Sequence, residues 1–319
     1  MLTTLRVRRY NPEDPEPKLF FEDYHLELNP SDSVLDGLIK VRETLDDSLT
    51  LRCSCRGAIC GSCGMRINGH AALACKTKVV SVATSGETIE VEPMSNMPVI
   101  KDLVTDMAPF WEKIRQIQPW LQPSKPPPPA EYLAPPESMN HLAGVMGCIM
   151  CGVCVSDCTV LEVDPKFAGP AALAKAYRFV ADPRDTTKTI RLENLNQPGG
   201  MWDCTRCMEC IQVCPKGVAP MDRIMALRSK AMAEKMPATC GSRHAEVFAD
   251  IIQHKGMLDE PMLAIRTFGL KHVGRLFEMF PMVMQSLFKG KVPLSGPLHR
   301  PISSIQHIQR LFKRVRKKS

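Results

Sequence analysis

The spacing of cysteines constrains this 319-residue chain more than any other feature. Twelve of its fourteen cysteines stand in three groups of four. The groups are Cys55, Cys60, Cys63 and Cys75; then Cys148, Cys151, Cys154 and Cys158; and finally Cys204, Cys207, Cys210 and Cys214. The first follows C-x4-C-x2-C with a later fourth cysteine, and the other two both follow C-x2-C-x2-C-x3-C. Whatever the fold, it has to bring these thiols together.

Disulfide bonds are a poor explanation for these cysteines. The N-terminal residues Met1–Tyr10 have no apolar stretch of the kind that begins a secretory signal peptide. No window reaches the roughly 18 apolar residues that a membrane helix needs. We therefore expect a soluble chain in a reducing compartment, with its cysteines available as thiolates.

The net charge of +7 does not indicate a nucleic-acid-binding protein. Six positive charges belong to the last ten residues: Arg310, Lys313, Arg314, Arg316, Lys317 and Lys318. Because the rest of the chain is nearly balanced, the charge is a property of this tail.

The first cysteine group has the plant-type spacing for a [2Fe–2S] cluster. Gly57, Gly61 and Gly64 lie among the ligands, where glycine lets the backbone approach the sulfides and turn its N–H groups towards them. A zinc site would use Cys60 and Cys63 as one half, but the interleaved C-x4-C disfavours it. Cys53 stands outside the pattern, and we expect it to be a spare thiol.

The second and third groups together indicate a two-cluster ferredoxin module, in which each run gives its fourth cysteine to the other run's cluster. Cys148, Cys151, Cys154 and Cys214 are then expected to hold one [4Fe–4S] cluster. Cys204, Cys207, Cys210 and Cys158 are expected to hold the third cluster of the chain. Cys240 lies beyond both runs and is expected to be structural.

The remaining sequence predicts an α+β protein. Strands are expected at Thr4–Tyr10, Leu19–Leu28 and Val79–Val91, and a helix capped by Ser33 between the second and third. Cys53–Cys75 is expected to be a loop region, Lys101–Leu121 a helix, and Pro123–Pro136 an extended linker. Ala171–Val180 and Asp222–Glu234 are expected helices, and later helices should break at Gly256, Pro261, Gly269, Pro281 and Pro293.

These expectations define four segments. Residues 1–107 form a plant-type [2Fe–2S] ferredoxin (β-grasp) domain, and residues 108–140 a helix and proline-rich linker. Residues 141–235 form an α-helical, bacterial-type two-cluster ferredoxin domain, and residues 236–319 a helical extension with a basic tail. The sequence has no nucleotide-binding loop and no paired acid and base beside a nucleophile, so no catalytic residue is predicted. The chain is expected to conduct electrons between partners that bind the reactants.

At several of these places the sequence resembles the iron–sulfur subunit of the succinate dehydrogenase and fumarate reductase family. The matching segments are Ser54–Cys63 (SCRGAICGSC), Asn68–Cys75 (NGHAALAC), Met97–Met107, Pro119–Leu121, Gly169–Asp185 and Cys214–Gly217. The resemblance implies electron transfer from a FAD-containing flavoprotein subunit through three clusters to quinone at a membrane anchor. It also implies a peripheral position on the cytoplasmic face of the inner membrane, held by the partner subunits, with no role for nucleic acid.

Three departures from the family pattern matter. An apolar residue in the position of Cys207 commonly leaves the family's third cluster as [3Fe–4S]; a cysteine there predicts [4Fe–4S], with [3Fe–4S] as the alternative. The usual quinone-site residues are absent, because Thr159, Val163 and Thr205 stand where the family has Pro, Trp and His. Arg243–Glu260 resembles heterodisulfide-reductase-type subunits, which pair with CCG-domain proteins. The alternative function is therefore that of the iron–sulfur subunit of a heterodisulfide-reductase-like or thiol-linked fumarate reductase.

The last segment has a helical apolar pattern at Ile305, Ile308, Leu311, Phe312 and Val315, surrounded by basic residues. Such a helix suits an anionic membrane surface or an acidic partner, and it is also compatible with a solvated tail. The sequence leaves these three interpretations open.

Overall fold

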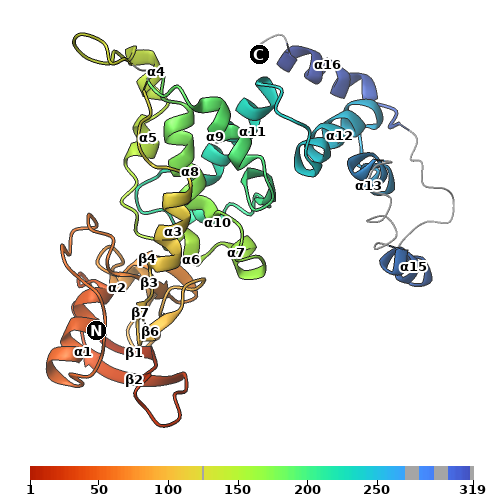
Figure 1. Ribbon diagram of the computed structural model, residues 1–319. Coiled ribbons are helices and arrows are strands. Elements are labelled where there is room, and N and C mark those ends of the chain that lie inside the picture. Colours follow the sequence, from red (N-terminus) through yellow and green to blue (C-terminus); the bar gives the residue numbers. More distant parts are fainter. Residues whose placement is uncertain (124–125, 270–279, 291–300, 317–319) are drawn as a thin grey trace. The chain divides into compact units, whose positions relative to one another are not determined.

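The computed structural model describes residues 1–123, 126–269, 280–290 and 301–316. The chain divides into two compact units, residues 1–234 and 235–319. In the described residues every strand belongs to the first unit, which places a mixed sheet before a group of short helices (Figure 1). The α+β class predicted from the sequence is confirmed. The four segment boundaries proposed above stay a prediction.

The main sheet has five strands in the order β2-β1-β5-β3-β4. β1 (Leu2–Arg9) pairs antiparallel with β2 (Phe20–Glu27) and parallel with β5 (Thr88–Glu92). β3 (Gly64–Ile67) pairs antiparallel with β5 and with β4 (His70–Leu73). Alternation along β1 directs Leu5 and Val7 into the core, where both are fully buried.

The helix α1 (Val34–Thr44) covers this sheet and begins as the sequence predicts. The Ser33 hydroxyl accepts a hydrogen bond from the Asp36 amide at 3.2 Å, and the Asp36 carboxylate accepts one from the Ser33 amide at 2.9 Å. This reciprocal capping satisfies two amides that the first turn leaves without helical partners. A Cβ on Gly37 would lie 3.0 Å from Leu28 and 3.1 Å from Leu5, so glycine allows the helix to pack closely on the sheet.

Two predicted elements are wrong in part. The expected strand Val79–Val91 begins with a helical turn, α2 (Val79–Val82), and only Thr88–Glu92 is a strand. The Val79 amide bonds the Asp32 carbonyl at 2.9 Å, and the Val79 side chain is fully buried. This local burial overrides the strand preference of consecutive valines.

The expected helix Lys101–Leu121 begins only at Ala108, as α3 (Ala108–Gln116). Before it, β6 (Val99–Lys101) and β7 (Val104–Thr105) form a hairpin around the buried Asp102. The Asp102 carboxylate accepts the Tyr10 amide at 3.1 Å and the Thr50 amide at 2.8 Å, which fixes the turn. These partners are distant in sequence, so helical periodicity alone did not reveal them.

The β3–β4 hairpin lies inside the segment that we expected to be a loop. Asn68 and Gly69 connect the strands with φ values of 49° and 81°. An Asn-Gly pair between short apolar runs is a strong hairpin signal, so the sequence contained evidence for this element. The hairpin returns the chain from Cys63 to Cys75.

Short helices complete the first unit around the buried α8 (Gly169–Val180), which packs against α11 (Pro220–Ala233). Both agree with the predicted helices at Ala171–Val180 and Asp222–Glu234. The others are α4 (Pro136–Asn140), α5 (Ala143–Met146), α6 (Val153–Ser156), α7 (Thr159–Val163), α9 (Lys188–Leu195), the 3-10 turn η1 (Met201–Asp203) and α10 (Glu209–Gln212). In the predicted linker, the described residues before α4 contain neither helix nor strand.

A buried ion pair fixes the segment that follows α3 to the helical part of the first unit. Arg191 Nη2 lies 3.0 Å from Asp185 Oδ2, and both side chains are almost inaccessible to solvent. The same guanidinium donates to the carbonyls of Ile117, Gln118 and Trp120 at 2.8–3.0 Å. One side chain thus holds three backbone groups and a carboxylate in place.

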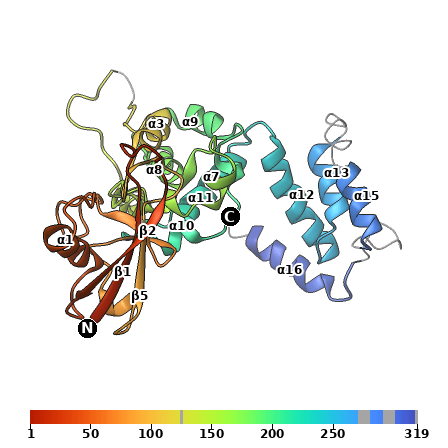
Figure 2. The ribbon, with the colours of Figure 1, turned by 90° about the horizontal axis from the view of Figure 1, so that it is seen from below.

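The second unit, seen in Figure 2, contains α12 (Cys240–Lys255), α13 (Glu260–Phe268), α15 (Phe280–Phe288) and α16 (Ile305–Arg316) among its described residues. Gly256 ends α12 with φ 77°, Pro261 lies in the first turn of α13, and α13 ends before Gly269. Pro281 is the second residue of α15, and Pro293 lies outside the described residues. Among described helices, none is long and apolar enough to cross a membrane.

We predict that Arg191→Met strongly destabilises the first unit. It leaves the buried Asp185 carboxylate without its cation, a change that costs about 3–5 kcal/mol in proteins. The melting temperature of the cluster-loaded chain should fall by roughly 10 °C. Arg6→Gln is the matched control, because the Arg6–Asp23 pair is largely exposed and should contribute little. Equal melting temperatures for the two variants would contradict a structural role for Arg191.

Candidate iron–sulfur centres

The first cysteine group converges through a loop that wraps around its own sulfurs. Cys55 Sγ accepts the amides of Gly57, Ile59 and Cys60 at 3.4, 3.3 and 3.2 Å. The Cys55 amide in turn donates to Cys60 Sγ at 3.5 Å. On the returning segment, the Ala74 amide bonds the Cys63 carbonyl at 3.0 Å, which sets Cys75 beside the loop.

Left-handed backbone conformations give this loop its shape. They occur at Arg56, Ala58 and Gly61, with φ values of 51°, 56° and 73°. Of the three glycines that the sequence analysis chose, only Gly61 has a positive φ. Alternating hand turns successive N–H groups to the same side of the chain, and such a concave surface binds anions. Arg56 and Ala58 therefore shape the loop through their backbone conformation. The sequence analysis missed them because it considered side-chain chemistry.

One cavity brings together cysteines from both later runs. Cys148, Cys151, Cys154 and Cys214 line a single cavity, with Ala171 and Ala174 of α8 on its wall. Burial, followed by the charges of Cys148 and Cys214, raises the pKa of Cys151 to about 11. The pKa of Cys154 is raised well above its usual value, again mainly by burial. The fourth cysteine of this cavity, Cys214, comes from the third group, and the exchange of ligands between the two runs stays a prediction.

The remaining four later cysteines lie close enough to affect one another's ionisation. Burial raises the pKa of Cys158, and the nearby charges of Cys207 and Cys204 raise it further. Burial also raises the pKa of Cys210 to about 12, with additional contributions from Cys204, Cys207 and Cys158. Cys158 and Cys210 are buried, whereas Cys207 is exposed.

The chemistry of these donor sets suits iron–sulfur clusters. All fourteen cysteines are free thiols. Burial raises the pKa of Cys63 to about 12, whereas a hydrogen bond with Ser62, assisted by the Cys55 amide, lowers the pKa of Cys60 to about 6. Several buried thiols held together cannot all ionise unless positive charge lies among them, and a bound metal supplies that charge. The residues therefore fit three thiolate-bound groups.

The comparisons with known proteins agree with this geometry. The 2Fe-2S iron-sulfur cluster binding domain matches residues 4–112, and the 4Fe-4S dicluster domain matches residues 144–218. The fumarate reductase iron-sulfur subunit of Mycobacterium tuberculosis (strain CDC 1551 / Oshkosh) is 40% identical over 229 residues, which are 71% of this chain and 92% of that protein. The chain belongs to the family of succinate dehydrogenase and fumarate reductase iron–sulfur subunits.

Other relatives support the assignment. Succinate dehydrogenase [ubiquinone] iron-sulfur subunit 3, mitochondrial, of Arabidopsis thaliana is 37% identical over 229 residues, which are 70% of this chain and 74% of that protein. The Mycobacterium smegmatis Sdh1 complex in the apo form contains a chain with a TM-score of 0.67 and 31% identity, covering 75% of this chain and 99% of that one. This iron–sulfur subunit is thus part of an oxidoreductase, and the predicted [2Fe–2S] and [4Fe–4S] cofactors are confirmed.

The first two cysteine sites of this iron–sulfur subunit touch at a glycine. A Cβ on Gly61 would lie 2.7 Å from Cys151 Cβ and 2.9 Å from Cys151 Cα, closer than atoms can pack. Only a residue without a side chain allows the loop of Cys60 to approach Cys151 in this way. Met94, Met97 and Met107 surround the adjoining Gly152. Thioether side chains fill such irregular gaps and exclude water.

Three polar residues that sequence analysis missed hold the cysteine segments in place. The Asn96 amide donates to the carbonyls of Val155, Ser156 and Cys158 at 2.9–3.1 Å. The Asp157 carboxylate accepts Arg66 Nη1 at 2.5 Å and the Ala71 amide at 2.8 Å, which fixes the β3–β4 hairpin. Arg228 donates to the carbonyls of Met201, Trp202 and Cys204, each at 2.8 Å. Their partners lie far away in the sequence, so no local pattern indicated these roles.

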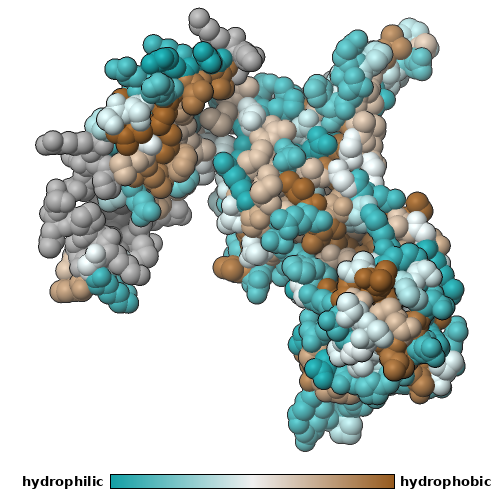
Figure 3. Space-filling view, turned by 180° about the vertical axis from the view of Figure 1, so that it is seen from behind, coloured by the Kyte–Doolittle hydropathy of each residue, from teal (hydrophilic) through white to brown (hydrophobic). Residues whose placement is uncertain are grey.

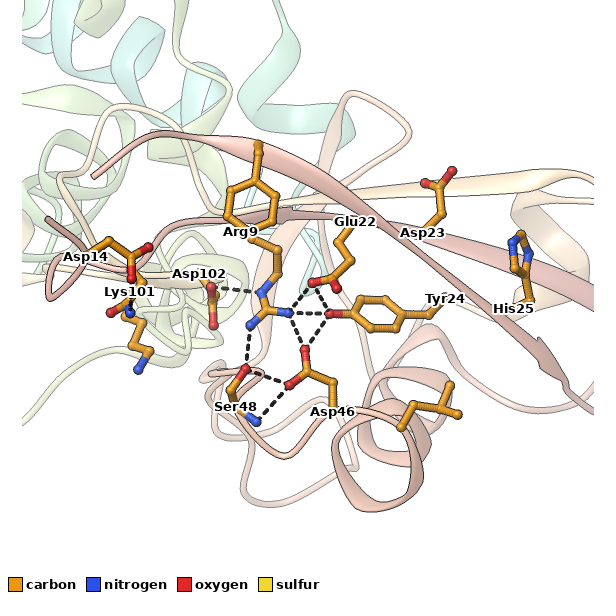
Figure 4. Close-up of a pocket in the computed structure, with 13 residues that line it drawn as sticks. Arg9, Asp14, Glu22, Asp23, Tyr24, His25, Asp46, Ser48, Lys101 and Asp102 are labelled. Atoms are coloured by element: carbon orange, nitrogen blue, oxygen red, sulfur yellow. Dashed lines mark hydrogen bonds and ion pairs between the residues drawn. The ribbon is translucent and has the colours of Figure 1, made fainter. Parts of the chain in front are cut away.

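A buried arginine supports the chain just before the first cysteine loop. Figure 4 shows Arg9 between Asp102 on one side and Glu22, Tyr24 and Asp46 on the other. Its guanidinium donates to Asp102 Oδ1 at 3.0 Å, Glu22 Oε2 at 2.6 Å and Ser48 Oγ at 2.9 Å. Since Asp102 also binds the Thr50 amide, Arg9 fixes the segment that leads into the loop.

We predict that Gly61→Ala separates the first two clusters. The new methyl group must push the Cys60 loop away from Cys151, which should weaken the magnetic interaction between the two reduced clusters in pulsed electron paramagnetic resonance. Gly69→Ala is the matched control, because Gly69 has a similar φ of 81°, but a Cβ added there would meet no atom within 4 Å. Both variants carry the same backbone strain, so an equal magnetic interaction in the two would contradict the prediction.

Proposed function

We propose that this chain transfers electrons between a FAD-containing flavoprotein subunit and a quinone-reactive membrane anchor in a succinate:quinone oxidoreductase. The bound clusters supply one-electron carriers, and the chain binds them and sets their spacing. The proposed [2Fe–2S] ligands are Cys55, Cys60, Cys63 and Cys75. The proposed ligands of the [4Fe–4S] cluster are Cys148, Cys151, Cys154 and Cys214, and those of the third cluster are Cys158, Cys204, Cys207 and Cys210.

The observation that carries this proposal is the contact at Gly61. It places the loop of Cys60 directly beside Cys151, and the proposed exchange of Cys158 and Cys214 would connect the later two sites. The result is a continuous series of three thiol groups. The family relatives are subunits of enzymes that exchange electrons with succinate or fumarate, which supports a flavoprotein partner at one end and an anchor at the other.

We further propose that the third cluster is [4Fe–4S]. The backbone around Cys207 matches that around Cys151: Met150 and Gly152 have φ values of 57° and 78°, and Arg206 and Met208 have 62° and 72°. The left-handed residues thus flank the second cysteine of each run in the same way. Met208 has the same left-handed conformation as Gly152, although it is not a glycine. The fold therefore maintains this geometry against some backbone strain. This supports Cys207 as a fourth ligand.

The anchor is proposed to be of the CCG-domain type, and this chain is proposed to lie peripherally on the cytoplasmic face of the membrane, held by its partner subunits. Thr159, Val163 and Thr205 replace the usual quinone-site residues, and the Val163 side chain is 86% exposed at the end of α7. The segment Arg243–Glu260 supports the same branch of the family. A thiol-linked fumarate reductase remains the second candidate, because CCG-type partners also serve that chemistry.

Purification of the complete complex tests the function. We expect a flavoprotein subunit and a CCG-domain protein to co-purify, and succinate to reduce the clusters in the presence of both. A quinone should then reoxidise them. If a dithiol but not quinol drives fumarate reduction in this complex, the second candidate replaces the first. If no flavoprotein co-purifies and succinate leaves the clusters oxidised, both are wrong.

We predict that the oxidised protein gives no strong [3Fe–4S] signal in electron paramagnetic resonance. Cys207→Ala removes the proposed fourth ligand and should produce that signal without loss of the other clusters. Cys240→Ala is the control and should leave the spectrum unchanged. A strong [3Fe–4S] signal in the unmodified, anaerobically prepared protein would show that Cys207 does not bind iron.

We also predict that only twelve cysteines are ligands. Cys53→Ser and Cys240→Ser should leave the iron content unchanged, since neither belongs to the three groups. Cys60→Ser should instead remove the two irons of the [2Fe–2S] cluster and loosen its loop. Loss of iron in Cys53→Ser alone would require a different first ligand set, and iron analysis with visible absorption measures each case.

A further inference from the structure

The helix α16 carries an unusual concentration of positive charge. Residues 305–316 contain Arg310, Lys313, Arg314 and Arg316 and no acidic residue, and Lys317 and Lys318 follow in the sequence. Among the described residues, no carboxylate lies within ion-pair distance of Arg310, Lys313 or Arg314. The charge of this helix is therefore not neutralised within the described part of its unit.

One side of α16 packs within its own unit. The Ile302 amide just before it bonds the Lys255 carbonyl at the end of α12, at 3.0 Å. A Cβ on Gly256 would lie 2.6 Å from Ile302 and 3.2 Å from Ile308, so these side chains lie directly against the end of α12. Ile305, Ile308 and Phe312 are accordingly half-buried.

Another part of the apolar stripe is exposed to solvent. Leu311 is 60% exposed and Val315 is 65% exposed, and they are four residues apart, on successive turns of the helix. Arg310 and Arg314 each precede one of them by a single residue, so two cations lie about 100° round the helix from two exposed apolar side chains. Figure 3 shows hydrophobic residues beside a hydrophilic edge on this unit.

We propose that α16 binds an anionic lipid surface, with Leu311 and Val315 entering the headgroup–acyl boundary and Arg310 and Arg314 at the lipid phosphates. Exposed apolar side chains beside cations with no acidic neighbour are complementary in charge to such a surface. By helical spacing, Arg310, Lys313 and Arg314 fall within about 100° of one side of the helix. A cationic face of this kind is attracted to the negative potential of an anionic lipid surface. The proposal does not depend on the electron-transfer function or on the identity of the anchor.

Flotation of the full, cluster-loaded chain with vesicles tests this directly. Vesicles of equal parts phosphatidylglycerol and phosphatidylcholine should bind the chain at low salt, and vesicles of phosphatidylcholine alone should bind it weakly. Arg310→Gln/Arg314→Gln should reduce binding to the anionic vesicles roughly tenfold to thirtyfold. Lys235→Gln/Lys289→Gln removes the same charge from exposed positions of this unit outside α16, and it should have a much smaller effect.

A second pair of variants tests the apolar contact. Leu311→Ser should weaken binding to anionic vesicles several-fold, whereas Leu133→Ser, at a 79% exposed position of the first unit, should not. Iron content and helical circular dichroism should be unchanged in all variants, because every substituted side chain is exposed. Equal binding by the arginine variant and its control overturns the proposal. Loss of binding on arginine removal without any effect of Leu311→Ser also overturns it, because the helix would then be only an electrostatic docking surface.

Discussion

The proposed exchange of the fourth cysteines is the constraint on which the helical part of the first unit depends. Cys158 lies with the thiols of the third group, and Cys214 lies with those of the second, so neither run can form its site alone. The chain between them has to fold into a loop that brings two distant segments together. α8, which lies between them, packs on α11 and contributes Ala171 and Ala174 to the wall of the cavity that Cys148, Cys151, Cys154 and Cys214 line. Binding of the clusters and folding are therefore expected to be coupled.

A glycine, which has no side chain, allows the first two cysteine sites to approach closely. Polar side chains hold the cysteine segments in place. Gly61 permits contact with Cys151, and the methionines around Gly152 close the surrounding space. Further out, Asn96, Asp157 and Arg228 bind the backbone of the cysteine segments. Each of these groups is satisfied by carbonyls, amides or an opposite charge, as buried polar groups require. These hydrogen bonds connect the cysteine segments to other parts of the first unit.

The two units differ in what they expose. In the first unit, buried ion pairs such as Arg191–Asp185 and Arg9–Asp102 join segments that are far apart in the sequence. In the described part of the second unit, basic side chains of α16 remain exposed beside apolar ones. The first arrangement supports fixed distances between redox centres. The second suits contact with a large charged surface, and the two roles are compatible within one chain.

Cysteine spacing by itself indicated the cofactor types and the three groups of thiols, because metal ligands need particular residue types at short fixed intervals. The family was indicated by the resemblance of further segments, such as Asn68–Cys75 and Gly169–Asp185. Local chemistry also predicted α1 with its Ser33 cap, as well as α8 and α11. Other features depend on contacts between distant residues. The strand expected at Val79 became a helical turn because Val79 is buried, and the helix expected at Lys101 was displaced by the hairpin around Asp102. Likewise, only the tertiary structure decided that Gly61 would meet Cys151 and that Leu311 would stay exposed, since no pattern within either segment specifies its neighbour.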